Sequence, residues 1–266
     1  MADDFSAPHA RDLVQYAVDG STARVTLDSP RNRNALSSML VQQLHQGLRD
    51  AAANPKVRAV VLGHTGETFC AGADLSEAAS APETDRTRQM TDLLRAMLQL
   101  PLPVVGGIDG HVRAGAFGLV GACDIVVAGP NSTFALTEAR IGVAPAIISL
   151  TLLPKITARA AGRYYLTGEK FGAEEAQRIG LVSVAADDVD ATVGQITAEL
   201  AKGSPQGLRE SKALTTAAIL DGYDERAEQF SAQSARLFGS DEAREGMLAF
   251  LQKRPPSWAP RLAPER

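Results

Sequence analysis

The chain has 266 residues, of which 45% are hydrophobic and 22% are charged, and its formal net charge is −4. These values are typical of a globular protein with enough apolar material for a sizeable core. The slightly acidic balance and the lack of a long basic run argue against a nucleic-acid partner. No run of about 18 apolar residues is present, so the sequence predicts no membrane span.

The opening residues Met1–Asp4 are acidic and no apolar signal core follows them, so we expect a cytoplasmic protein. Cys70 and Cys123 both lie inside apolar segments, which favours buried free thiols over a disulfide. No cluster of histidine, cysteine or carboxylate residues has the spacing of metal ligands, so we expect no metal site.

The N-terminal part of the chain predicts a hairpin, a helix and a buried strand. Residues 13–18 and 23–27 are short β-rich runs on either side of Asp19-Gly20, a dipeptide typical of hairpin turns. Ser37 is a candidate N-cap for the helix that follows. Residues 57–62 are apolar apart from Arg58, as is expected of a strand that is covered on both faces.

Two stretches rich in glycine and alanine come next, and each follows an apolar, β-rich run. The first is Thr68–Leu75 (TFCAGADL) and the second is Asp109–Gly118 (DGHVRAGAFG). Small residues let the backbone approach a ligand closely and leave N–H groups without partners. Two such N–H groups aimed at one point would form an oxyanion hole, which stabilises charge on an acyl oxygen. Tight packing between strands and helices is the alternative, and these letters alone do not exclude it.

Between these stretches, residues 76–85 are polar and unpatterned, and we interpret them as a loop over the site. Residues 86–100 then carry apolar side chains at helical spacing, which predicts a helix ended by Pro101-Leu102-Pro103. The stripe is either core or a wall for an acyl chain, with core preferred. Its members are Met90, Leu93, Leu94, Met97 and Leu98.

Glu138 is the carboxylate that the sequence favours for proton transfer. Its apolar neighbours along the chain are Phe134, Leu136, Ile141 and Val143. Burial among such residues raises a carboxyl pKa toward a value useful for acid–base catalysis. The alternative is a glutamate at a helix start that interacts with the dipole or with Arg140.

From Pro205 onward the chain predicts three helices, with interruptions at Asp221-Gly222 and at 239–241. These helices have no strands to cover. We therefore expect them to pack on neighbouring subunits or to cap the site.

Three of these segments resemble the crotonase family, the enoyl-CoA hydratase/isomerase superfamily. Phe69–Leu75 is similar to the family's F-x-A-G-x-D-[LI] loop, and Asp109–Ala128 is similar to its N-G-x-A-x-G-G-G-x-x-L-x-x-x-C-D block. Ser132–Pro145 resembles the segment that carries a catalytic glutamate in the hydratases. The likeness extends roughly from Val14 to Lys253.

This resemblance implies an α/β fold, the crotonase-like spiral of β-β-α units with a C-terminal helical region. It also implies trimers, often paired into hexamers. We therefore divide the chain into a catalytic core at 1–200 and a C-terminal helical trimerisation region at 201–266. The implied substrate is an acyl-CoA thioester, and no cofactor is expected because CoA is part of the substrate.

The resemblance also assigns site residues. It places the thioester oxygen between the backbone N–H groups of Ala73 and Gly115, and it gives Glu138 the acid–base role. Arg31 and Arg33 would lie near the CoA phosphates, and Lys253 could reach one of them; solvated side chains are the alternative for all three. The other positions expected to contact the substrate are Ala71, Gly72, Asp74, Leu75 and Gly118.

One departure from the family pattern affects the chemistry. Typical hydratases carry a second glutamate three residues beyond the oxyanion glycine, and this chain has Gly118 there. Three interpretations remain, in order of preference. Glu138 alone could activate water in a hydratase, or act as the single base of a Δ3-Δ2-enoyl-CoA isomerase, or the chain could bind CoA esters with little hydratase activity.

Other polar residues in or beside the two loops could substitute for the missing group. They are Glu67, Asp74, His111 and Arg113. Asp74 is expected to hold its own loop. Arg113 replaces an apolar family residue and could recognise a second carboxylate of the acyl group, although a solvent-facing or interface salt bridge is preferred.

Overall fold

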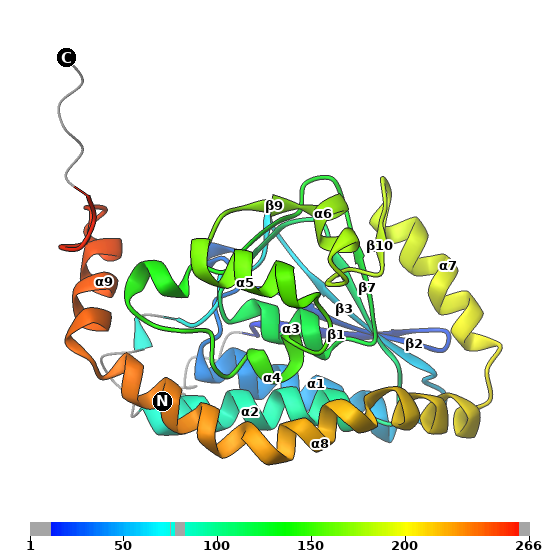
Figure 1. Ribbon diagram of the computed structural model, residues 1–266. Helices are drawn as coiled ribbons and strands as arrows, with labels where there is room; N and C mark the ends of the chain where they lie inside the picture. Colours follow the sequence, from blue (N-terminus) through cyan, green and yellow to red (C-terminus); the bar gives the residue numbers. More distant parts are fainter. Residues whose placement is uncertain (1–11, 75, 78–82, 261–266) are drawn as a thin grey trace, which may run out of the picture.

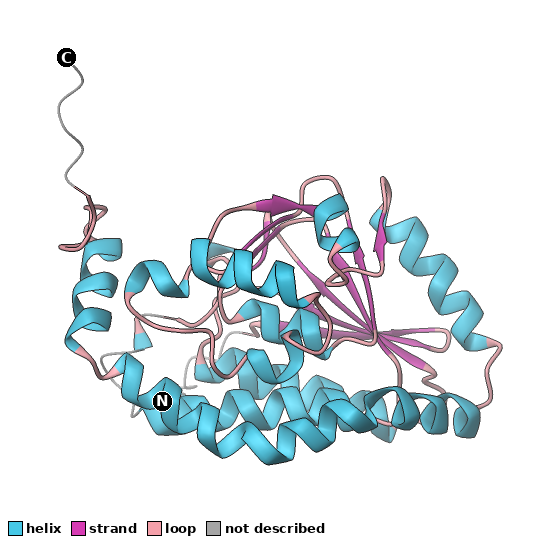
Figure 2. Cartoon of the chain, in the orientation of Figure 1, coloured by secondary structure: helices cyan, strands magenta, loops and turns pink. Residues whose placement is uncertain are grey.

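The computed structural model describes residues 12–74, 76–77 and 83–260. Within these residues the strands form a six-stranded sheet of order β1-β2-β3-β5-β7-β10 and a four-stranded sheet of order β4-β6-β8-β9. Helices surround both sheets, and one long helix, α8, crosses the bottom of the molecule in the view of Figure 1. Figure 2 shows the same arrangement by type of secondary structure.

The strands of the larger sheet are β1 Val14–Asp19, β2 Thr22–Leu27, β3 Ala59–His64, β5 Val104–Ile108, β7 Ile125–Ala128 and β10 Val184–Ala185. Those of the smaller sheet are β4 Thr68–Cys70, β6 His111–Arg113, β8 Thr133–Ala135 and β9 Phe171–Gly172. The helices are α1 Ser38–Ala53, α2 Glu83–Gln99, α3 Ala116–Ala122, α4 Ser149–Leu152, α5 Ala158–Thr167, α6 Ala173–Arg178, α7 Val189–Ala201, α8 Pro205–Phe238 and α9 Asp241–Leu251. Two short 3-10 helices are η1 Pro30–Asn32 and η3 Glu138–Ile141.

The middle of the chain repeats one unit three times. A strand of the larger sheet (β3, β5, β7) is followed by a strand of the smaller sheet (β4, β6, β8) and then by a helical segment. Within each sheet the three strands pair in parallel, so each repeat advances by one strand in both sheets. This is the predicted spiral of β-β-α units.

Local predictions in the N-terminal part are confirmed. Strands β1 and β2 pair antiparallel, and Gly20 in their turn has a φ of +56°, which glycine adopts without a steric penalty. The Ser37 hydroxyl accepts a hydrogen bond from the Leu40 N–H at 3.3 Å and so caps α1. Strand β3 is buried along its first four residues, because helices cover both faces of the sheet.

Side chains of the larger sheet alternate between two apolar cores. Val60 and Leu62 of β3 point into the main core, which helices α1, α2 and α3 help to enclose. Val61, which lies between them, points to the other face and packs in a smaller cluster with Val193 of α7. This alternation follows from the two-residue period of a strand. It explains why the run reads as continuously apolar.

The predicted helix break at Asp221-Gly222 is wrong. Helix α8 runs without interruption along α2 (Figure 1). A glycine inside a helix costs about 1 kcal/mol relative to alanine, but contacts with α2 directly after Gly222 offset that cost. The Tyr223 hydroxyl donates to the Thr91 carbonyl oxygen at 2.6 Å, and Asp224 forms an ion pair with Arg95.

A buried ion pair joins α8 to the start of β5. The Lys212 ammonium lies 2.8 Å from the Asp124 carboxylate and also donates to the carbonyl oxygens of Met97 and Leu102, at 2.8 and 3.0 Å. Asp124 in turn accepts a hydrogen bond from the Val104 N–H at 2.7 Å. The aspartate of the second motif therefore has a structural role.

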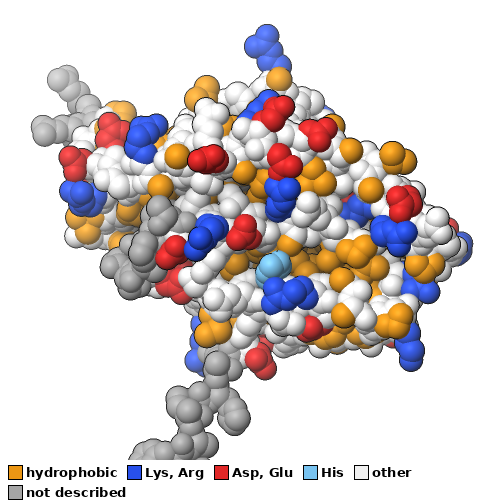
Figure 3. All heavy atoms as spheres, turned by 90° about the horizontal axis from the view of Figure 1, so that it is seen from below, with side chains coloured by type: hydrophobic (Ala, Val, Ile, Leu, Met, Phe, Trp, Pro, Cys, Tyr) orange, Lys and Arg blue, Asp and Glu red, His pale blue; other side chains and the backbone are white. Residues whose placement is uncertain are grey.

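Figure 3 views the molecule from below, the side along which α8 and α2 run in Figure 1. Hydrophobic side chains lie there in patches between acidic and basic ones, so the face carries no single sign of charge. No helix in the described part of the chain is long and apolar enough to cross a lipid bilayer.

Candidate active site

Three of the predicted site residues follow neighbouring strands of the smaller sheet. Ala73 comes three residues after β4, Gly115 two residues after β6, and Glu138 three residues after β8. These strands are adjacent and parallel, so their carboxyl ends meet at one edge. Ligands of parallel sheets bind outside this edge. The topology thus brings together groups that lie 65 positions apart in the chain.

The two glycine-rich loops lie directly against each other. A β-carbon added to Gly72 would stand 3.1 Å from the Gly115 nitrogen, and one added to Gly115 would stand 3.5 Å from the Ala73 nitrogen. Gly72 also has a φ of +88°, a conformation that side chains disfavour. Ala114 has a φ of +46°, which turns the chain ahead of Gly115. Small residues are therefore required where the loops meet.

The N–H groups of Ala73 and Gly115 lie where the two loops meet. Within the described part of the chain, neither donates a hydrogen bond. The flanking N–H groups of the first loop are used instead, because Ala71 donates to the Arg33 carbonyl oxygen at 3.0 Å and Asp74 to that of Leu36 at 3.4 Å. Two unpaired donors thus remain on facing loops, as an oxyanion hole requires.

Asn34, which the sequence analysis missed, fixes the first loop. It is fully buried and has a φ of +53°. Its side-chain oxygen accepts from the Ser29 N–H at 2.7 Å, and its amide nitrogen donates to the carbonyl oxygens of Thr65 and Thr68, at 3.0 and 2.8 Å. Asparagine tolerates the left-handed conformation better than most residues. This tolerance, together with the position of Asn34 in a loop that also contains proline, is the sequence signal that could have identified it.

Arg113 holds the second loop to the next strand. Its guanidinium donates to the Thr133 carbonyl oxygen at 2.6 Å and to the Thr133 hydroxyl at 2.7 Å. His111 Nδ1 lies 3.0 Å from the same hydroxyl. No carboxylate of the described residues pairs with Arg113, and burial lowers the pKa of its guanidinium. The expected solvent-facing salt bridge is thus not seen among the described residues, and the interface salt bridge stays a prediction.

Glu138 is buried with one oxygen unsatisfied. Only 7% of the residue is exposed, and among the described residues Oε2 has no hydrogen-bond partner. Burial raises the pKa of this carboxyl to about 7. The alternative partner, Arg140, instead donates to the Thr167 carbonyl oxygen at 3.0 Å. A carboxyl that titrates near neutrality can both accept and return a proton.

Tyr165 of α5 lies in the same apolar surroundings and was also missed. Ser149 donates its hydroxyl proton to the Pro145 carbonyl oxygen at 2.7 Å, and its oxygen lies 3.0 Å from the Tyr165 hydroxyl. Because the serine proton is committed to Pro145, Tyr165 is the donor of this second bond. Burial, and to a smaller extent the charge of Glu138, raises the pKa of Tyr165.

Apolar side chains face Gly118, the position of the family's second glutamate. A β-carbon there would lie 3.0 Å from Ile148, 3.1 Å from Leu94 and 3.2 Å from Met90. The stripe on α2 is mainly core, as preferred, since all its members but Met90 are buried. Met90 is partly buried. Among the described residues, the three nearest neighbours of a β-carbon at Gly118 are therefore all apolar.

The remaining predicted residues include three exposed basic side chains and the carboxylate of the first loop. Arg31 and Arg33 are exposed on and just after η1, and Lys253 is exposed just after α9. Asp74 holds its own loop, as predicted, because its carboxylate accepts from the N–H and hydroxyl of Ser76, at 2.9 and 2.6 Å. Leu75 lies outside the described residues.

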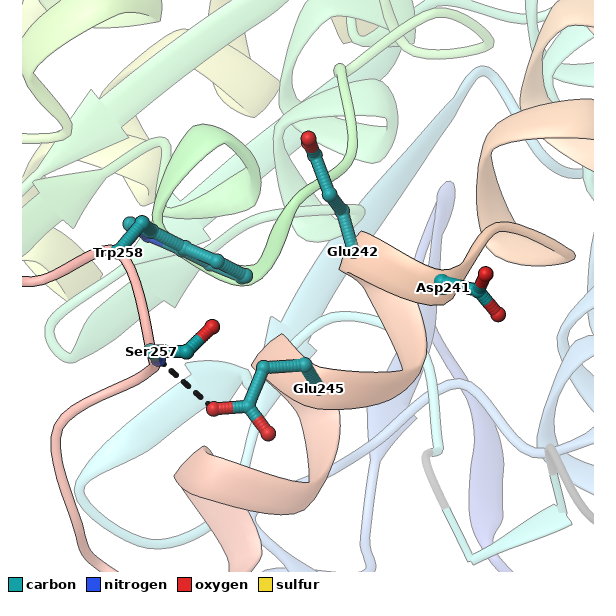
Figure 4. Close-up of a pocket in the computed structure, with 5 residues that line it drawn as sticks. All are labelled: Asp241, Glu242, Glu245, Ser257 and Trp258. Carbon is teal, nitrogen blue, oxygen red and sulfur yellow. Dashed lines mark hydrogen bonds between the residues drawn. The ribbon is translucent and has the colours of Figure 1, made fainter.

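The loop predicted at 76–85 lies only partly within the described chain, because residues 78–82 are outside it. Its predicted end is wrong, since α2 already begins at Glu83. The hollow drawn in Figure 4 lies between α9 and the segment after it, and no predicted site residue lines it. In the described part of the chain, no three histidine, cysteine or carboxylate residues are placed to hold a metal ion.

Comparison with known proteins decides the family. A sequence model described as Enoyl-CoA hydratase/isomerase matches residues 18–261. The chain belongs to this family. It is similar to a solved structure of an enoyl-CoA hydratase from Mycobacterium avium, with 64% identity, a TM-score of 0.89, and coverage of 94% of this chain and 100% of that one.

Two further relatives differ in the acyl groups that their names specify. Mevalonyl-coenzyme A hydratase of Aspergillus fumigatus is 30% identical over 89% of this chain and 90% of that protein. Carnitinyl-CoA dehydratase of Proteus mirabilis is 29% identical over 90% of this chain and 95% of that protein. Family membership confirms the predicted crotonase-like fold and makes an acyl-CoA thioester the substrate class.

Proposed function

We propose that the protein adds water across the double bond of a 2-enoyl-CoA thioester, with Glu138 as its single acid–base residue. The observation that carries this proposal is a buried carboxyl with a pKa of about 7 at the same sheet edge as two unpaired backbone donors. The buried carboxyl is costly for a fold that does not use it, because an unsatisfied buried polar group destabilises the native state.

The two donors stabilise the charge that develops during addition. As water attacks C3, electron density moves through C2 onto the thioester oxygen, which accepts from the N–H groups of Ala73 and Gly115. Donors placed beforehand need no reorganisation, and the loss of one typically costs about 3 kcal/mol, on the order of a hundredfold in rate.

Glu138 handles the proton. The ionised carboxylate accepts a proton from the water molecule whose oxygen bonds to C3. The carboxylic acid then returns that proton to C2, so the product gains one water in total and the enzyme ends unchanged. A single group on one face can perform both transfers, which accounts for an apolar Gly118 position.

The test is hydration of crotonyl-CoA, followed by the loss of the conjugated thioester absorbance. Glu138→Gln keeps the shape of the side chain and removes its basicity, so we expect a fall of about 10²- to 10⁴-fold in kcat. Glu169→Gln is the matched control, because Glu169 lies at the surface in an ion pair with Arg163. An active Glu138→Gln variant, or an inactive wild type, would contradict the proposal.

A Δ3-Δ2-enoyl-CoA isomerase is the second candidate. It is favoured by the single carboxyl and the apolar surroundings of Gly118, since moving a proton between C4 and C2 needs one base and no water. Activity on a 3-enoyl-CoA alone, seen as a gain of conjugated absorbance, would support it. Tight binding of CoA esters with neither reaction would support a non-catalytic binder.

The CoA part of the substrate is proposed to bind outside the loops. Arg31 and Arg33 are exposed, and neither pairs with a carboxylate in the described part of the chain, so both can reach phosphate oxygens. None of the steps above calls for a metal or a cofactor. Trimers with residues 201–266 at the interface stay a prediction, which the molar mass in solution tests.

A further inference from the structure

The short helix that carries Glu138 has few hydrogen bonds of its own, such as those from the Arg140 N–H to the Thr137 carbonyl oxygen and from the Gly142 N–H to the Glu138 carbonyl oxygen. Helix η3 has four residues, and the side chain of its N-cap, Thr137, makes no capping hydrogen bond. It ends at Gly142, which has a φ of +78°. A helix this short has little intrinsic stability. The position of Glu138 therefore depends on what packs against η3.

Helix α9 contacts η3 backbone to backbone. A β-carbon on Gly246 would lie 2.5 Å from the carbonyl carbon of Ile141, and one on Gly142 would lie 2.7 Å from the carbonyl group of Glu242. Each helix thus has a glycine where the other helix's backbone passes. These neighbours are backbone atoms, so a side chain at either glycine must move a helix.

Helix η3 also contacts the end of α5. Gly168, with a φ of +61°, would place a β-carbon 2.8 Å from the Leu136 carbonyl oxygen and 2.9 Å from Arg140 Nε. Arg140 also donates to the Thr167 carbonyl oxygen. Helix η3 therefore contacts both α5 and α9.

Helix α9 lies at one end of the molecule, beyond the end of α8 and away from both sheets (Figure 1). Its other side borders the hollow in Figure 4, where the Ser257 N–H donates to the Glu245 carboxylate at 2.8 Å. Ala243 and Ala249 on α9 are buried, whereas Leu248 and Phe250 are exposed. The buried face of α9 is thus made of small residues that allow close approach.

We propose that α9 positions the Glu138 carboxyl through its glycine contact with η3, with Gly246 and Gly142 as positioning residues. The inference rests on the proposed role of Glu138. It assigns the C-terminal helix a part in the reaction of its own chain. A displacement of about 1 Å at a reacting group can cost on the order of a hundredfold in rate.

Gly246→Ala tests the proposal, with Gly222→Ala in α8 as the matched control because its β-carbon would meet nothing within 4 Å. For Gly246→Ala we expect kcat to fall at least about tenfold while KM changes less than about twofold, since the oxyanion loops are untouched. The pH midpoint of kcat/KM should also fall below that of wild type, because a displaced η3 admits water beside Glu138. Gly222→Ala should change neither quantity.

Gly142→Ala perturbs the same contact between η3 and α9, with the substitution at the end of η3. The double variant Gly142→Ala/Gly246→Ala should lose less than the product of the two single losses, because both substitutions break one contact. Losses that simply multiply would overturn the proposal. So would a Gly246→Ala enzyme that matches Gly222→Ala in both kcat and pH midpoint.

A failure of the proposed function is distinguishable from a failure of this inference. If wild type catalyses neither reaction, the Glu138 carboxyl can still be titrated by infrared spectroscopy. The spectrum of each protein (wild type, Gly246→Ala and Gly222→Ala) is compared with that of the same protein carrying Glu138→Gln. A lower midpoint in Gly246→Ala than in Gly222→Ala supports positioning by α9, and equal midpoints overturn it.

Discussion

Two buried charged side chains, Lys212 and Glu138, are treated in opposite ways by this fold. They are 5% and 7% exposed. Lys212 has the Asp124 carboxylate and two carbonyl oxygens as partners, whereas Glu138 keeps an oxygen with no partner among the described residues. A buried charge with full partners holds two elements together. A buried carboxyl without partners destabilises the folded state, and a bound ligand can offset that cost by interacting with it.

The largest expected effect on stability comes from breaking the satisfied pair. Lys212→Met removes the ammonium and leaves the partly buried Asp124 carboxylate with a hydrogen bond from the Val104 N–H, so we expect the free energy of unfolding to fall by about 3 kcal/mol. Urea denaturation measures it. Lys202→Met removes an exposed ammonium that pairs with Glu199, and it should change stability by less than about 1 kcal/mol. A Lys212→Met protein as stable as this control would remove the contrast with Glu138.

Glu138→Gln should have the opposite effect on stability at alkaline pH. In the folded protein the pKa of the Glu138 carboxyl is about 7, which is above its ordinary value. The contribution of this carboxyl to the free energy of unfolding is therefore largest below about pH 4, and it is lost as the pH rises through 7. Glutamine does not ionise and avoids that loss. We therefore expect the variant to gain as much as about 3 kcal/mol over wild type at pH 8, since one pKa unit equals about 1.4 kcal/mol.

Urea denaturation at pH 5 and pH 8 measures this effect. The stability difference between Glu138→Gln and wild type should be larger at pH 8. An equal difference at both pH values would mean that the Glu138 carboxyl is not desolvated in the folded state.

Restoring the family's second glutamate sharpens the comparison further. Gly118→Glu drives a side chain into Ile148, Leu94 and Met90, so we expect a loss of about 1–3 kcal/mol and no gain in hydration rate. Gly162→Glu is the matched control, because a β-carbon there meets nothing within 4 Å. Faster crotonyl-CoA hydration by Gly118→Glu would show that the site has room for a second carboxyl.

The smallest effect is expected at the surface. Arg31→Ala should raise KM for an acyl-CoA several-fold and leave kcat unchanged, because a solvated charge contributes about 1 kcal/mol or less. The increase in KM should shrink at high salt, which screens exposed charges. Arg24→Ala, at an exposed position on β2, is the control. Equal KM values for both variants would exclude Arg31 from CoA binding.

Local signals predicted the parts of the fold that depend on few residues. The Gly20 turn, the Ser37 cap and the continuous apolar run of β3 are each specified by neighbours in the chain. The spiral itself required the resemblance, because no local pattern states which strands pair. Helix α8 was misjudged at Gly222 because propensity favoured a break and contacts with α2 overrode it.

The site was predictable where a motif marks it and not where distant segments meet. Ala73, Gly115 and Glu138 stand in motifs, and the structure places them after neighbouring strands. Asn34 acts through carbonyl groups 31 and 34 residues away, so its role depends on how the chain folds back. The position of Glu138 against α9 is likewise set by Gly246, which lies more than 100 residues later.

Each candidate site residue stands on its own segment beyond one sheet edge, which has an evolutionary consequence. A substitution in one segment can exchange one chemical group while the ladder of strand hydrogen bonds stays as it was. Gly118 in helix α3 illustrates this, because the chain has no carboxyl at that position and retains the spiral of β-β-α units. This arrangement allows the acyl specificity to change during evolution while the fold is retained.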